Sequence, residues 1–457
     1  FTKDKEVVCM LTDQIKQAGV VGAGGAGFPT HVKLDAEAEY FIVNAAECEP
    51  LIETDKYFCR NFADRIIDGA VMTGQHIKAQ KIVIALKREY ERETAALQSS
   101  INRKHAPVEM FPMDAFYPTG DEQVMVQLVT GRSVPERGIP LSVGAVVDNV
   151  GTVLNIYNAS KGIPLTEKYL SVTGDVAKPV VFKVPMGTPL IDCIDRARPN
   201  ADEYEVIAGG PMMGKLLMSR EDILEKTVSK TTSNLLILPK GHCLPERTRR
   251  PMSYNLHMAK SACLQCSFCT TMCPRYRIGH DMQPHKLMRA MFLEKHIAGD
   301  EQYLKLYGSA MNCSECGVCE IYACPMGLSP RKVNVYLKQQ LRARKIDVPK
   351  NQSPQARELT LAGRAATSRL VARLGLTEYY AHADDSCIEL VPDFVSLPMS
   401  QHIGKPADPV VRAGDQVSKG DLVGAAEEGA LSANIHASID GIVERADLDS
   451  VTIRRVG

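Results

Sequence analysis

The sequence of 457 residues contains no tryptophan, and its aromatic residues amount to 6%, which leaves few rings for stacking on nucleic-acid bases. It contains no apolar run near the roughly 18 residues that a membrane-spanning helix needs. Its 54 basic side chains balance 54 acidic ones, so no net charge draws it toward nucleic acid. The basic stretch Arg247–Arg250 is short and has no interleaved aromatic residues. We therefore expect no membrane span and no nucleic-acid partner.

Residues 1–9 contain no apolar run of signal-peptide length, so we expect a cytoplasmic protein. The chain nevertheless contains 14 cysteines, and many of them lie between Cys263 and Cys324. A disulfide framework is typical of small secreted domains, whereas clustered cysteines in a reducing compartment indicate metal ligands. Hydrophobic residues make up 45% of the sequence, enough for packed cores, and the length predicts roughly three domains.

The clustered cysteines form two motifs, each with three cysteines at CxxCxxC spacing and a fourth followed by proline. The motifs are Cys263-x2-Cys266-x2-Cys269-x3-Cys273-Pro274 and Cys313-x2-Cys316-x2-Cys319-x4-Cys324-Pro325. Such a loop wraps one face of an iron–sulfur cube, and in two-cluster ferredoxins the fourth cysteine ligates the other cluster. Two zinc sites would instead need cysteine pairs separated by longer spacers. We predict two [4Fe–4S] clusters, one held by Cys263, Cys266, Cys269 and Cys324 and one by Cys313, Cys316, Cys319 and Cys273.

Hydrophobic periodicity predicts alternating strands and helices over about 1–160, which indicates an α/β domain. The predicted strands are 40–44, 81–86 and 107–111, and the predicted helices are 5–18, 59–78, 88–101, 121–130 and 151–160. Residues 165–240 contain short β-like runs and a helix at 189–198, which predicts a small α+β module. The cysteine region contains a helical stretch around 284–298. A charged helix is expected over 353–374, followed by short strands over 394–457.

A glycine-rich run contains Gly22, Gly24, Gly25 and Gly27. Glycine permits positive φ and lets backbone N–H groups approach a phosphate closely. A Rossmann loop follows a strand and opens a helix, whereas this run follows a helix and precedes a strand. The run is therefore not a Rossmann site by its own context.

Three further runs are Asn44–Pro50 after a strand, Tyr117–Glu122 in a turn, and Asp148–Thr152 at the start of a helix. A helix start offers N–H groups to an anion or a ring edge. Each run taken alone has a structural interpretation, as a helix cap, a solvated acid or a turn. Their combination is what carries a resemblance.

The runs GAGGAGFPTHVKL, NAAECEP, YPTGDEQ and DNVGT resemble the flavin- and NADH-binding fold shared by RnfC and the flavoprotein subunit of respiratory complex I. Those proteins bind FMN, take hydride from NADH and pass single electrons to iron–sulfur centres. The resemblance implies a multidomain α/β protein of five parts. These are an FMN/NADH-binding α/β domain (1–160), an SLBB β-grasp module (165–240), a ferredoxin-like double [4Fe–4S] domain (250–345), a helical connector (346–390) and a barrel-sandwich β module (394–457).

The barrel-sandwich segment lies at the C-terminus here, whereas RnfC proteins carry the related segment at the N-terminus. This order, with the longer second cysteine motif, is similar to cobalamin reductases of the PduS type from propanediol-utilisation microcompartments. The resemblance implies electron transfer to cobalamin for adenosylcobalamin regeneration. It also implies an adenosyltransferase and microcompartment shell proteins as partners, and a place in the cytoplasm inside such a compartment. The module has no obvious lipoate or biotin lysine, since Lys419 lies in an ordinary turn, and we expect it to be a docking unit.

The resemblance also assigns roles to individual residues, with the chemistry carried by FMN and the clusters rather than by a catalytic side chain. The four glycines would line FMN, with Lys33 toward its phosphate. The ring and ribityl chain would be surrounded by Asn44, Glu47, Tyr117, Gly120, Asn149 and Thr152, and the nicotinamide nucleotide would meet Phe28 and Glu49. Ala46 stands where complex I has an aspartate, which removes one polar contact to flavin. Two alternatives stay open, an iron–sulfur relay without NADH activity and an electron donor for another reductase, such as an amino-acid reductase.

Overall fold

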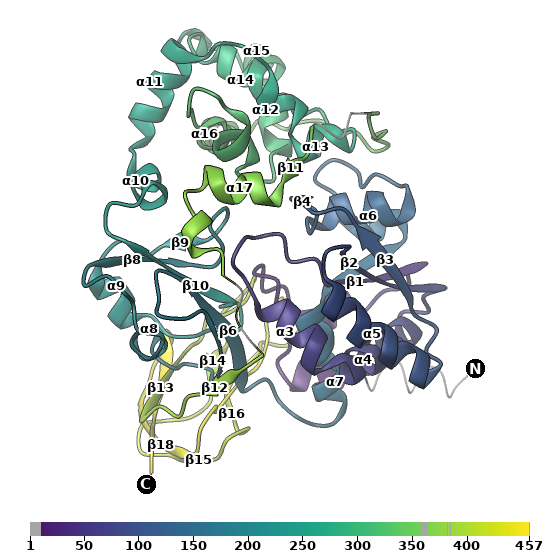
Figure 1. Ribbon diagram of the computed structural model, residues 1–457, viewed down its shortest axis with the longest axis vertical. Coiled ribbons are helices and arrows are strands. Elements are labelled where there is room, and N and C mark those ends of the chain that lie inside the picture. The colour runs from purple at the N-terminus through teal and green to yellow at the C-terminus, as the bar shows by residue number, and fades with distance from the viewer. Residues whose placement is uncertain (1–10, 359–362, 382, 384, 457) are drawn as a thin grey trace.

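The computed structural model describes residues 11–358, 363–381, 383 and 385–456. Figure 1 shows a parallel α/β unit at the lower right, a β-sheet unit at the left, a helical unit at the top and a small β module at the lower left. None of the described helices is long and apolar enough to cross a membrane. The predicted class, a multidomain α/β protein, is confirmed by this arrangement.

The first unit is built on a four-stranded parallel sheet in the order β3-β2-β1-β5. Its strands are β1 (Tyr40–Asn44), β2 (Lys81–Lys87), β3 (Glu109–Met113) and β5 (Ala145–Asn149). Apolar runs such as YFIVN suit strands that are covered on both faces. Asn44 lies beside Asn149 in the β1–β5 register, so the runs after these strands leave the sheet at one edge. That carboxyl edge is where parallel α/β sheets bind ligands.

Helices cover both faces of this sheet. One face packs against α3 (Thr54–Asn61), α4 (Ala63–His76), α5 (Glu91–Lys104) and α7 (Val150–Ser160). On the other face, α6 (Glu122–Thr130) buries Met125 and Val126 against strand residues. The predicted helix 59–78 is two helices that meet at Phe62. Residues 11–17 are helical, and the first part of the predicted helix 5–18 lies outside the described residues.

The second unit is a six-stranded sheet in the order β12-β7-β6-β10-β8-β9. Its strands are β6 (Glu167–Gly174), β7 (Val180–Pro185), β8 (Tyr204–Ala208), β9 (Lys215–Leu216), β10 (Asn234–Pro239) and β12 (Cys387–Glu389). The parallel β6–β10 pair sits at its centre, and the predicted helix 189–198 is present as α8 (Leu190–Ala197). A second short helix, α9 (Arg220–Glu225), completes the module.

The cysteine region is a helical unit. Its elements are α10 (Cys243–Arg249), α11 (Met252–Ala262), α12 (Phe268–Thr271), α13 (Pro274–Arg277), α14 (Pro284–Ala290), η2 (Glu294–His296), α15 (Asp300–Tyr307), η3 (Gly308–Asn312), η4 (Cys319–Ala323) and α16 (Pro330–Ala343). The predicted helix 284–298 ends early, at Ala290. The extra residue of the second motif is absorbed by η4, a single π-helical turn. A π-turn accommodates one additional residue without displacing the segments on either side.

The connector differs from the helix expected over 353–374. Residues 353–358 are irregular, residues 359–362 lie outside the described residues, and the α-helix in the described part of this stretch is α17 (Thr367–Arg373). The two-residue strand β11 (Ala365–Ala366) pairs with β4 (Phe116–Tyr117) of the first unit, and β12 pairs with β7 of the second. Long-range strand pairing therefore overrides the local helical pattern.

The C-terminal module consists of two small sheets, β13-β19-β18-β15 and β14-β16-β17. Its strands are β13 (Phe394–Pro398), β14 (Asp408–Pro409), β15 (Gln416–Val417), β16 (Leu422–Ala425), β17 (Ile435–His436), β18 (Gly441–Ala446) and β19 (Ser450–Arg455). It packs against the second unit, where Ser438 Oγ donates to Met186 O at 2.6 Å. Lys419 forms an ion pair with Glu167 at 2.6 Å, so this lysine contributes to docking.

Candidate functional site

The glycine-rich run forms a closed loop against the start of α7. Gly22 N donates to Phe28 O at 2.9 Å, and Ala23 N donates to Thr152 Oγ1 at 2.9 Å. Gly25 has a φ of +101°, and a Cβ built on it would meet nothing within 4 Å. The loop is therefore fixed at its base and open above Gly25, as a backbone cradle for a phosphate requires.

The far end of the loop packs against two other units. A Cβ on Gly27 would lie 2.8 Å from Thr231 Cγ2, so no side chain fits between the loop and the second unit. Ile403 N of the C-terminal module donates to Gly27 O at 3.1 Å. Nearby, Lys230 Nζ donates to Gly19 O at 2.7 Å, and burial lowers the pKa of this lysine to about 7. Three units thus meet at the loop.

The run after β1 and the turn before α6 are joined directly. Asn44 Nδ2 donates to Gly120 O at 3.0 Å, and Asn44 Oδ1 accepts from Ala46 N at 3.1 Å. A Cβ on Gly120 would lie 2.4 Å from Ala46 O, so this turn requires glycine for close approach. At the adjacent strand end, Asn149 caps α7 by accepting from Gly151 N at 2.8 Å.

Buried carboxyl groups surround this edge of the sheet. Asn149 Nδ2 donates to Asp55 Oδ2 at 2.7 Å, and burial raises the pKa of Asp55. Burial and the nearby Asp55 likewise raise the pKa of Glu47. Perturbed carboxyl pKa values in a cleft are typical of functional sites.

Glu49 docks the first unit on the second. Its two carboxylate oxygens accept from Met212 N and Met213 N, each at 2.8 Å. Burial raises the pKa of Glu49 to about 7, although these two N–H groups and Arg331 act against the rise. Arg331 Nη1 donates to Met212 O at 3.1 Å, so the same loop is held from the cysteine region as well.

Lys33 lies under the sheet edge rather than free in the loop. Its Nζ is 3.3 Å from Asp148 Oδ1 and 3.2 Å from Glu122 Oε1. Burial lowers the pKa of Lys33, but the two carboxylates outweigh burial and leave it raised. The lysine remains charged and orders the strand end from which Asn149 and α7 begin.

These features fit a phosphate-bearing flavin. The loop offers backbone N–H groups and open space at Gly25, while Asn44, Asn149 and Glu47 place polar groups at the adjoining strand ends. Phe28 is half-buried beside them. The structure thus brings the sequence-predicted residues to one edge, with Lys33 in an ion pair and Glu49 in a domain contact.

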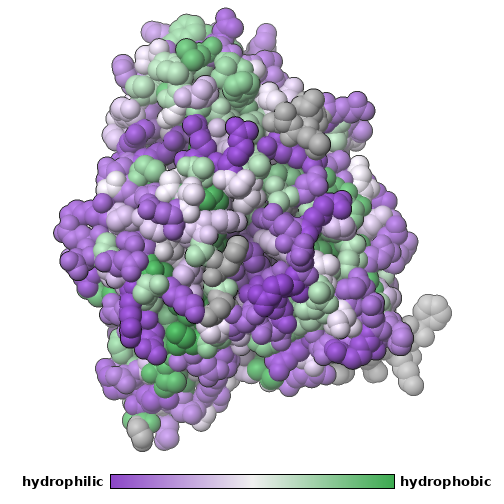
Figure 2. Space-filling view, in the orientation of Figure 1, coloured by the Kyte–Doolittle hydropathy of each residue, from purple (hydrophilic) through white to green (hydrophobic). Residues whose placement is uncertain are grey.

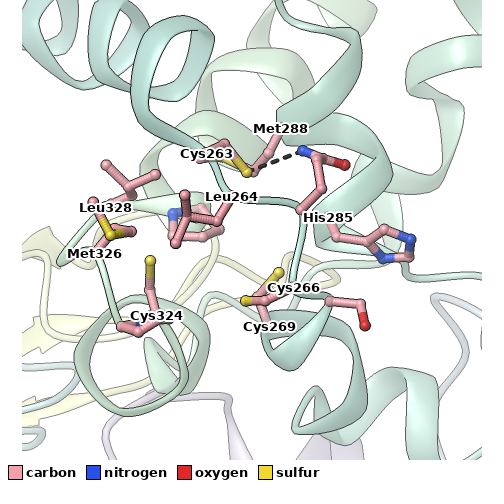
Figure 3. Close-up of a pocket in the computed structure, with 13 residues that line it drawn as sticks. Cys263, Leu264, Cys266, Cys269, His285, Met288, Cys324, Met326 and Leu328 are labelled. Atoms are coloured by element: carbon pink, nitrogen blue, oxygen red, sulfur yellow. Dashed lines mark hydrogen bonds between the residues drawn. The ribbon is translucent and has the colours of Figure 1, made fainter.

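Four cysteines line one pocket near the surface, and we call them the outer set: Cys263, Cys266, Cys269 and Cys324. Figure 3 shows the side chains of these four cysteines around a common space, with Leu264, Met326 and Leu328 alongside. Gln265 Nε2 donates to Cys263 Sγ at 3.0 Å. Burial raises the pKa of Cys269 to about 12, and the other three thiols add to the rise. Cys324, from the second motif, therefore joins the first three.

The other four cysteines form the inner set: Cys273, Cys313, Cys316 and Cys319. Burial raises the pKa of Cys273, and the thiols of Cys316 and Cys313 raise it further, which reports their proximity. Burial likewise raises the pKa of Cys319, and the thiols of Cys313, Cys316 and Cys273, together with the Glu320 carboxylate, raise it further. Each set thus combines three cysteines of one motif with the fourth of the other.

Both cysteine loops have the backbone of iron–sulfur binding loops. Gln265, Ser267 and Glu315 have positive φ, which turns successive N–H groups inward. Glu315 N donates to Cys313 Sγ at 3.3 Å, and Asn334 Nδ2 donates to the same sulfur at 3.4 Å. The donor set therefore fits cubes, with thiolate ligands and N–H···S bonds, better than lone metal ions.

The turn before α6 connects the flavin edge to the inner set. Tyr117 Oη donates to Cys316 O at 2.7 Å. Arg275, two residues after Cys273, forms two bonds to Asp121 at 2.7 and 3.0 Å. The Arg275 guanidinium outweighs burial and lowers the pKa of Asp121.

Sequence reasoning missed Asp55, Arg275 and the Met212 loop. Asp55 and Arg275 belong to no motif, and their partners are distant in the chain. Arg275 follows a Cys-Pro pair, which is the one local signal that it lies near a cluster.

Four family models match consecutive parts of the chain. They are the Nuo51 FMN-binding domain (15–158), the SLBB domain (169–216), a 4Fe-4S dicluster domain (262–329) and the RnfC barrel sandwich hybrid domain (380–453). The fold and these sites together define an oxidoreductase that uses flavin and [4Fe–4S] chemistry.

Among curated relatives, the cobalamin reductase PduS of Citrobacter freundii is 40% identical over 449 residues, covering 97% of this chain and 96% of the relative. PduS of Salmonella typhimurium gives the same values. The chain belongs to the PduS family. A more distant relative is one component of the proton-translocating ferredoxin:NAD(+) oxidoreductase complex of Clostridium ljungdahlii. It is 32% identical over 57% of this chain and 55% of the relative. A solved NAD+-reducing [NiFe]-hydrogenase overlaps with a TM-score of 0.47, at 20% identity over 74% of this chain and 63% of that chain.

Proposed function

We propose that this chain oxidises NADH and delivers the electrons one at a time to cobalamin, through FMN and two [4Fe–4S] clusters. One NADH would reduce two cob(III)alamin to two cob(II)alamin, with release of NAD+ and one proton. The observation that carries the proposal is the turn Tyr117–Glu122. It contacts the flavin edge through Gly120 and the inner cysteine set through Tyr117 and Asp121.

When bound, FMN supplies the conversion of a two-electron hydride into single electrons, and the chain supplies binding and orientation. Gly22, Gly24, Gly25 and Gly27 would cradle the phosphate, with Thr152 fixing the loop through Ala23 N. The ring and ribityl chain would be met by Asn44, Glu47, Tyr117, Gly120 and Asn149. Lys33 would contribute indirectly, because its ion pair with Asp148 orders the end of β5.

We assign the nicotinamide nucleotide to the side of the site bounded by Phe28 and Glu49. Phe28 is half-buried and offers a ring face for stacking. Glu49 would act by holding the Met212 loop against the site, since both of its oxygens are engaged there. Glu49→Gln should therefore weaken NADH use more than flavin content, because an amide cannot accept both N–H bonds.

Both cysteine sets would hold clusters, the inner set receiving electrons from the flavin side and the outer set releasing them. The family relationship supports cobalamin as the acceptor, because its relatives carry the name cobalamin reductase. An adenosyltransferase would take the reduced corrinoid, and a microcompartment shell would enclose both proteins in the cytoplasm. Cofractionation with shell proteins from a host grown on propanediol tests that location.

The decisive experiment uses anaerobically purified protein. Iron and released flavin per chain are measured first, and NADH is then titrated while the visible spectrum is recorded. About eight irons with FMN, bleached by NADH and reoxidised by hydroxocobalamin, is the expected result. Eight irons without flavin or bleaching would instead identify a relay, the alternative that Ala46 favours. Bleaching without reoxidation by hydroxocobalamin would point to another reductase as the acceptor.

A further inference from the structure

Two adjoining clefts open beside the outer cysteine set. Their volumes are about 260 and 340 Å³, and both are lined by Arg247, Arg250 and Gly327. The smaller cleft adds Arg373 at the end of α17, and the larger adds Tyr254 of α11. Together they form a concave surface that belongs to neither the glycine loop nor the cysteine pockets.

The clefts carry cations without counter-ions. No carboxylate is among the described residues that line them, and none of the three arginines forms an ion pair within the described chain. Glu320, whose backbone carbonyl accepts from Arg247, has its carboxylate paired with Arg331 at 2.6 Å. Arg249 of the same helix, by contrast, is paired with Glu205. The arginines without an acidic partner thus come from α10 (Arg247), from the residue that follows it (Arg250) and from α17 (Arg373).

Arg247 has an unused donor. Its Nη2 donates to Glu320 O at 2.6 Å and to Leu328 O at 2.9 Å, which fixes the side chain. Its Nε is buried and has no hydrogen-bond partner among the described residues. A buried N–H without an acceptor is costly, and a guanidinium fork matches the oxygens of a phosphate. An anion in the cleft would pair with the charge of this guanidinium, whose position is fixed by the two carbonyl groups.

The clefts lie against a cluster ligand. Pro325 and Gly327 follow Cys324 in the chain, and Arg373 Nη2 donates to Cys324 O at 3.2 Å. Three exposed apolar side chains lie nearby in the chain. Leu264 (65%) and Phe268 (55%) lie within the first cysteine motif, and Met326 (47%) follows the second. Figure 2 shows that apolar residues also gather at the top of the molecule, over the helical unit. An anion in the clefts would hold an attached apolar ring system beside the outer set.

We propose that the clefts bind the phosphate group of a small-molecule electron acceptor. The inference rests on the proposed function, because cobalamin carries one phosphodiester in its nucleotide tail and no other anionic group. Open clefts of this size suit a single anionic group of a small molecule better than the broad face of an acidic protein.

The test compares cobalamin with cobinamide, a corrinoid that lacks the phosphodiester. Arg250→Gln is the main variant, because the exposed Arg250 side chain lies over the Tyr254 ring and pairs with no acid of the described chain. We expect its KM for hydroxocobalamin to rise about tenfold, the worth of one charge-assisted hydrogen bond, with no rise for cobinamide. Arg249→Gln removes the same charge from the adjacent residue, which is paired with Glu205 and does not line the clefts, and should change neither KM. An equal rise for both corrinoids, or no rise, overturns the proposal.

A binding measurement separates this proposal from the function itself. Oxidised holoprotein is titrated with hydroxocobalamin and with inorganic pyrophosphate, and weaker binding of both by Arg250→Gln is expected. If the wild type reduces a dye with NADH but reduces no corrinoid, the proposed function fails, while the pyrophosphate titration still tests the cleft. Binding of pyrophosphate that Arg250→Gln leaves unchanged overturns the site. The site is also overturned if Arg250→Gln slows electron transfer to an acidic protein acceptor but leaves the binding and reduction of hydroxocobalamin unchanged.

Discussion

The two cysteine sets are built from the same motif but differ in the exposure of one cysteine and in what contacts their loops. In the inner set, Cys273, Cys316 and Cys319 are only 8%, 7% and 6% exposed, and Tyr117 and Asp121 of the first unit bond directly to its loops. In the outer set, Cys269 and Cys324 are each 9% exposed, but Cys266 is exposed and the neighbouring loops carry exposed apolar side chains. One sequence pattern therefore gives an inner set in contact with the first unit and an outer set with one exposed cysteine, which is the basis for proposing that electrons enter at the inner set and leave at the outer set.

The sharpest way to break this comparison is to remove one cysteine from each set. Cys316→Ala and Cys266→Ala should each lower the iron content by about four per chain. Cys316→Ala should also abolish NADH-dependent reduction of the remaining cluster, whereas Cys266→Ala should leave the inner cluster reducible. Iron analysis and electron paramagnetic resonance after NADH addition measure both. Cys243→Ala, an exposed cysteine outside the motifs, is the control, and an outer cluster that NADH still reduces in Cys316→Ala would contradict the order.

A second substitution removes the electron source from both sets. Gly25→Asp places a carboxylate in the open cradle at a φ of +101°. Repulsion of the phosphate should lower flavin content from about one per chain to less than about a tenth, as measured by released fluorescence. Gly162→Asp adds the same charge at a φ of +74°, also in open space. The cradle assignment is wrong if both variants keep their flavin.

A third substitution weakens the link between the flavin unit and the inner set. The Arg275–Asp121 pair is only 11% and 15% exposed, and removing one partner of such a pair costs about 3–5 kcal/mol. Arg275→Gln should therefore lower the free energy of unfolding by that order and slow reduction of the inner cluster. Urea unfolding and stopped-flow absorbance measure the two effects. Lys240→Gln, which breaks the exposed Lys240–Glu203 pair, should cost less than about 1 kcal/mol.

The smallest expected effect is a pH dependence at the interface of the first two units. The pKa of Glu49 is about 7 in the folded chain, against an ordinary value of 4.5. Between these values the unfolded chain loses the proton while the folded chain keeps it, so stability falls as pH rises from about 4.5 to about 7. Because the Glu49 side chain is half-buried and partly screened by solvent, the loss in the free energy of unfolding should be about 2 kcal/mol. The Glu49→Gln variant should lack this contribution, which is measured by comparing urea unfolding midpoints at pH 5 and pH 7.5. The same fall in stability between the two pH values in both proteins would contradict a raised pKa of Glu49.

The sequence was sufficient to predict the fold class and the relationship to RnfC and complex I proteins, because motifs and strand patterns are local. It was insufficient for the connector, where β11 and β12 form only because β4 and β7 offer unpaired edges. It also could not reveal that Glu49 bonds to Met212 or that Arg275 bonds to Asp121, because these partners are more than 150 residues apart. The arginine clefts escaped prediction for the same reason, since Arg373 joins Arg247 only in the folded chain.

The bond from Ile403 N to Gly27 O has a consequence for the order of synthesis. The ribosome makes the parallel sheet first and the segment that fixes the far end of the glycine loop among the last. A nascent chain that already contains both cysteine motifs therefore still has a loosened loop. We therefore expect flavin to bind late in synthesis. A chain that ends before residue 400 is expected to be released without bound flavin.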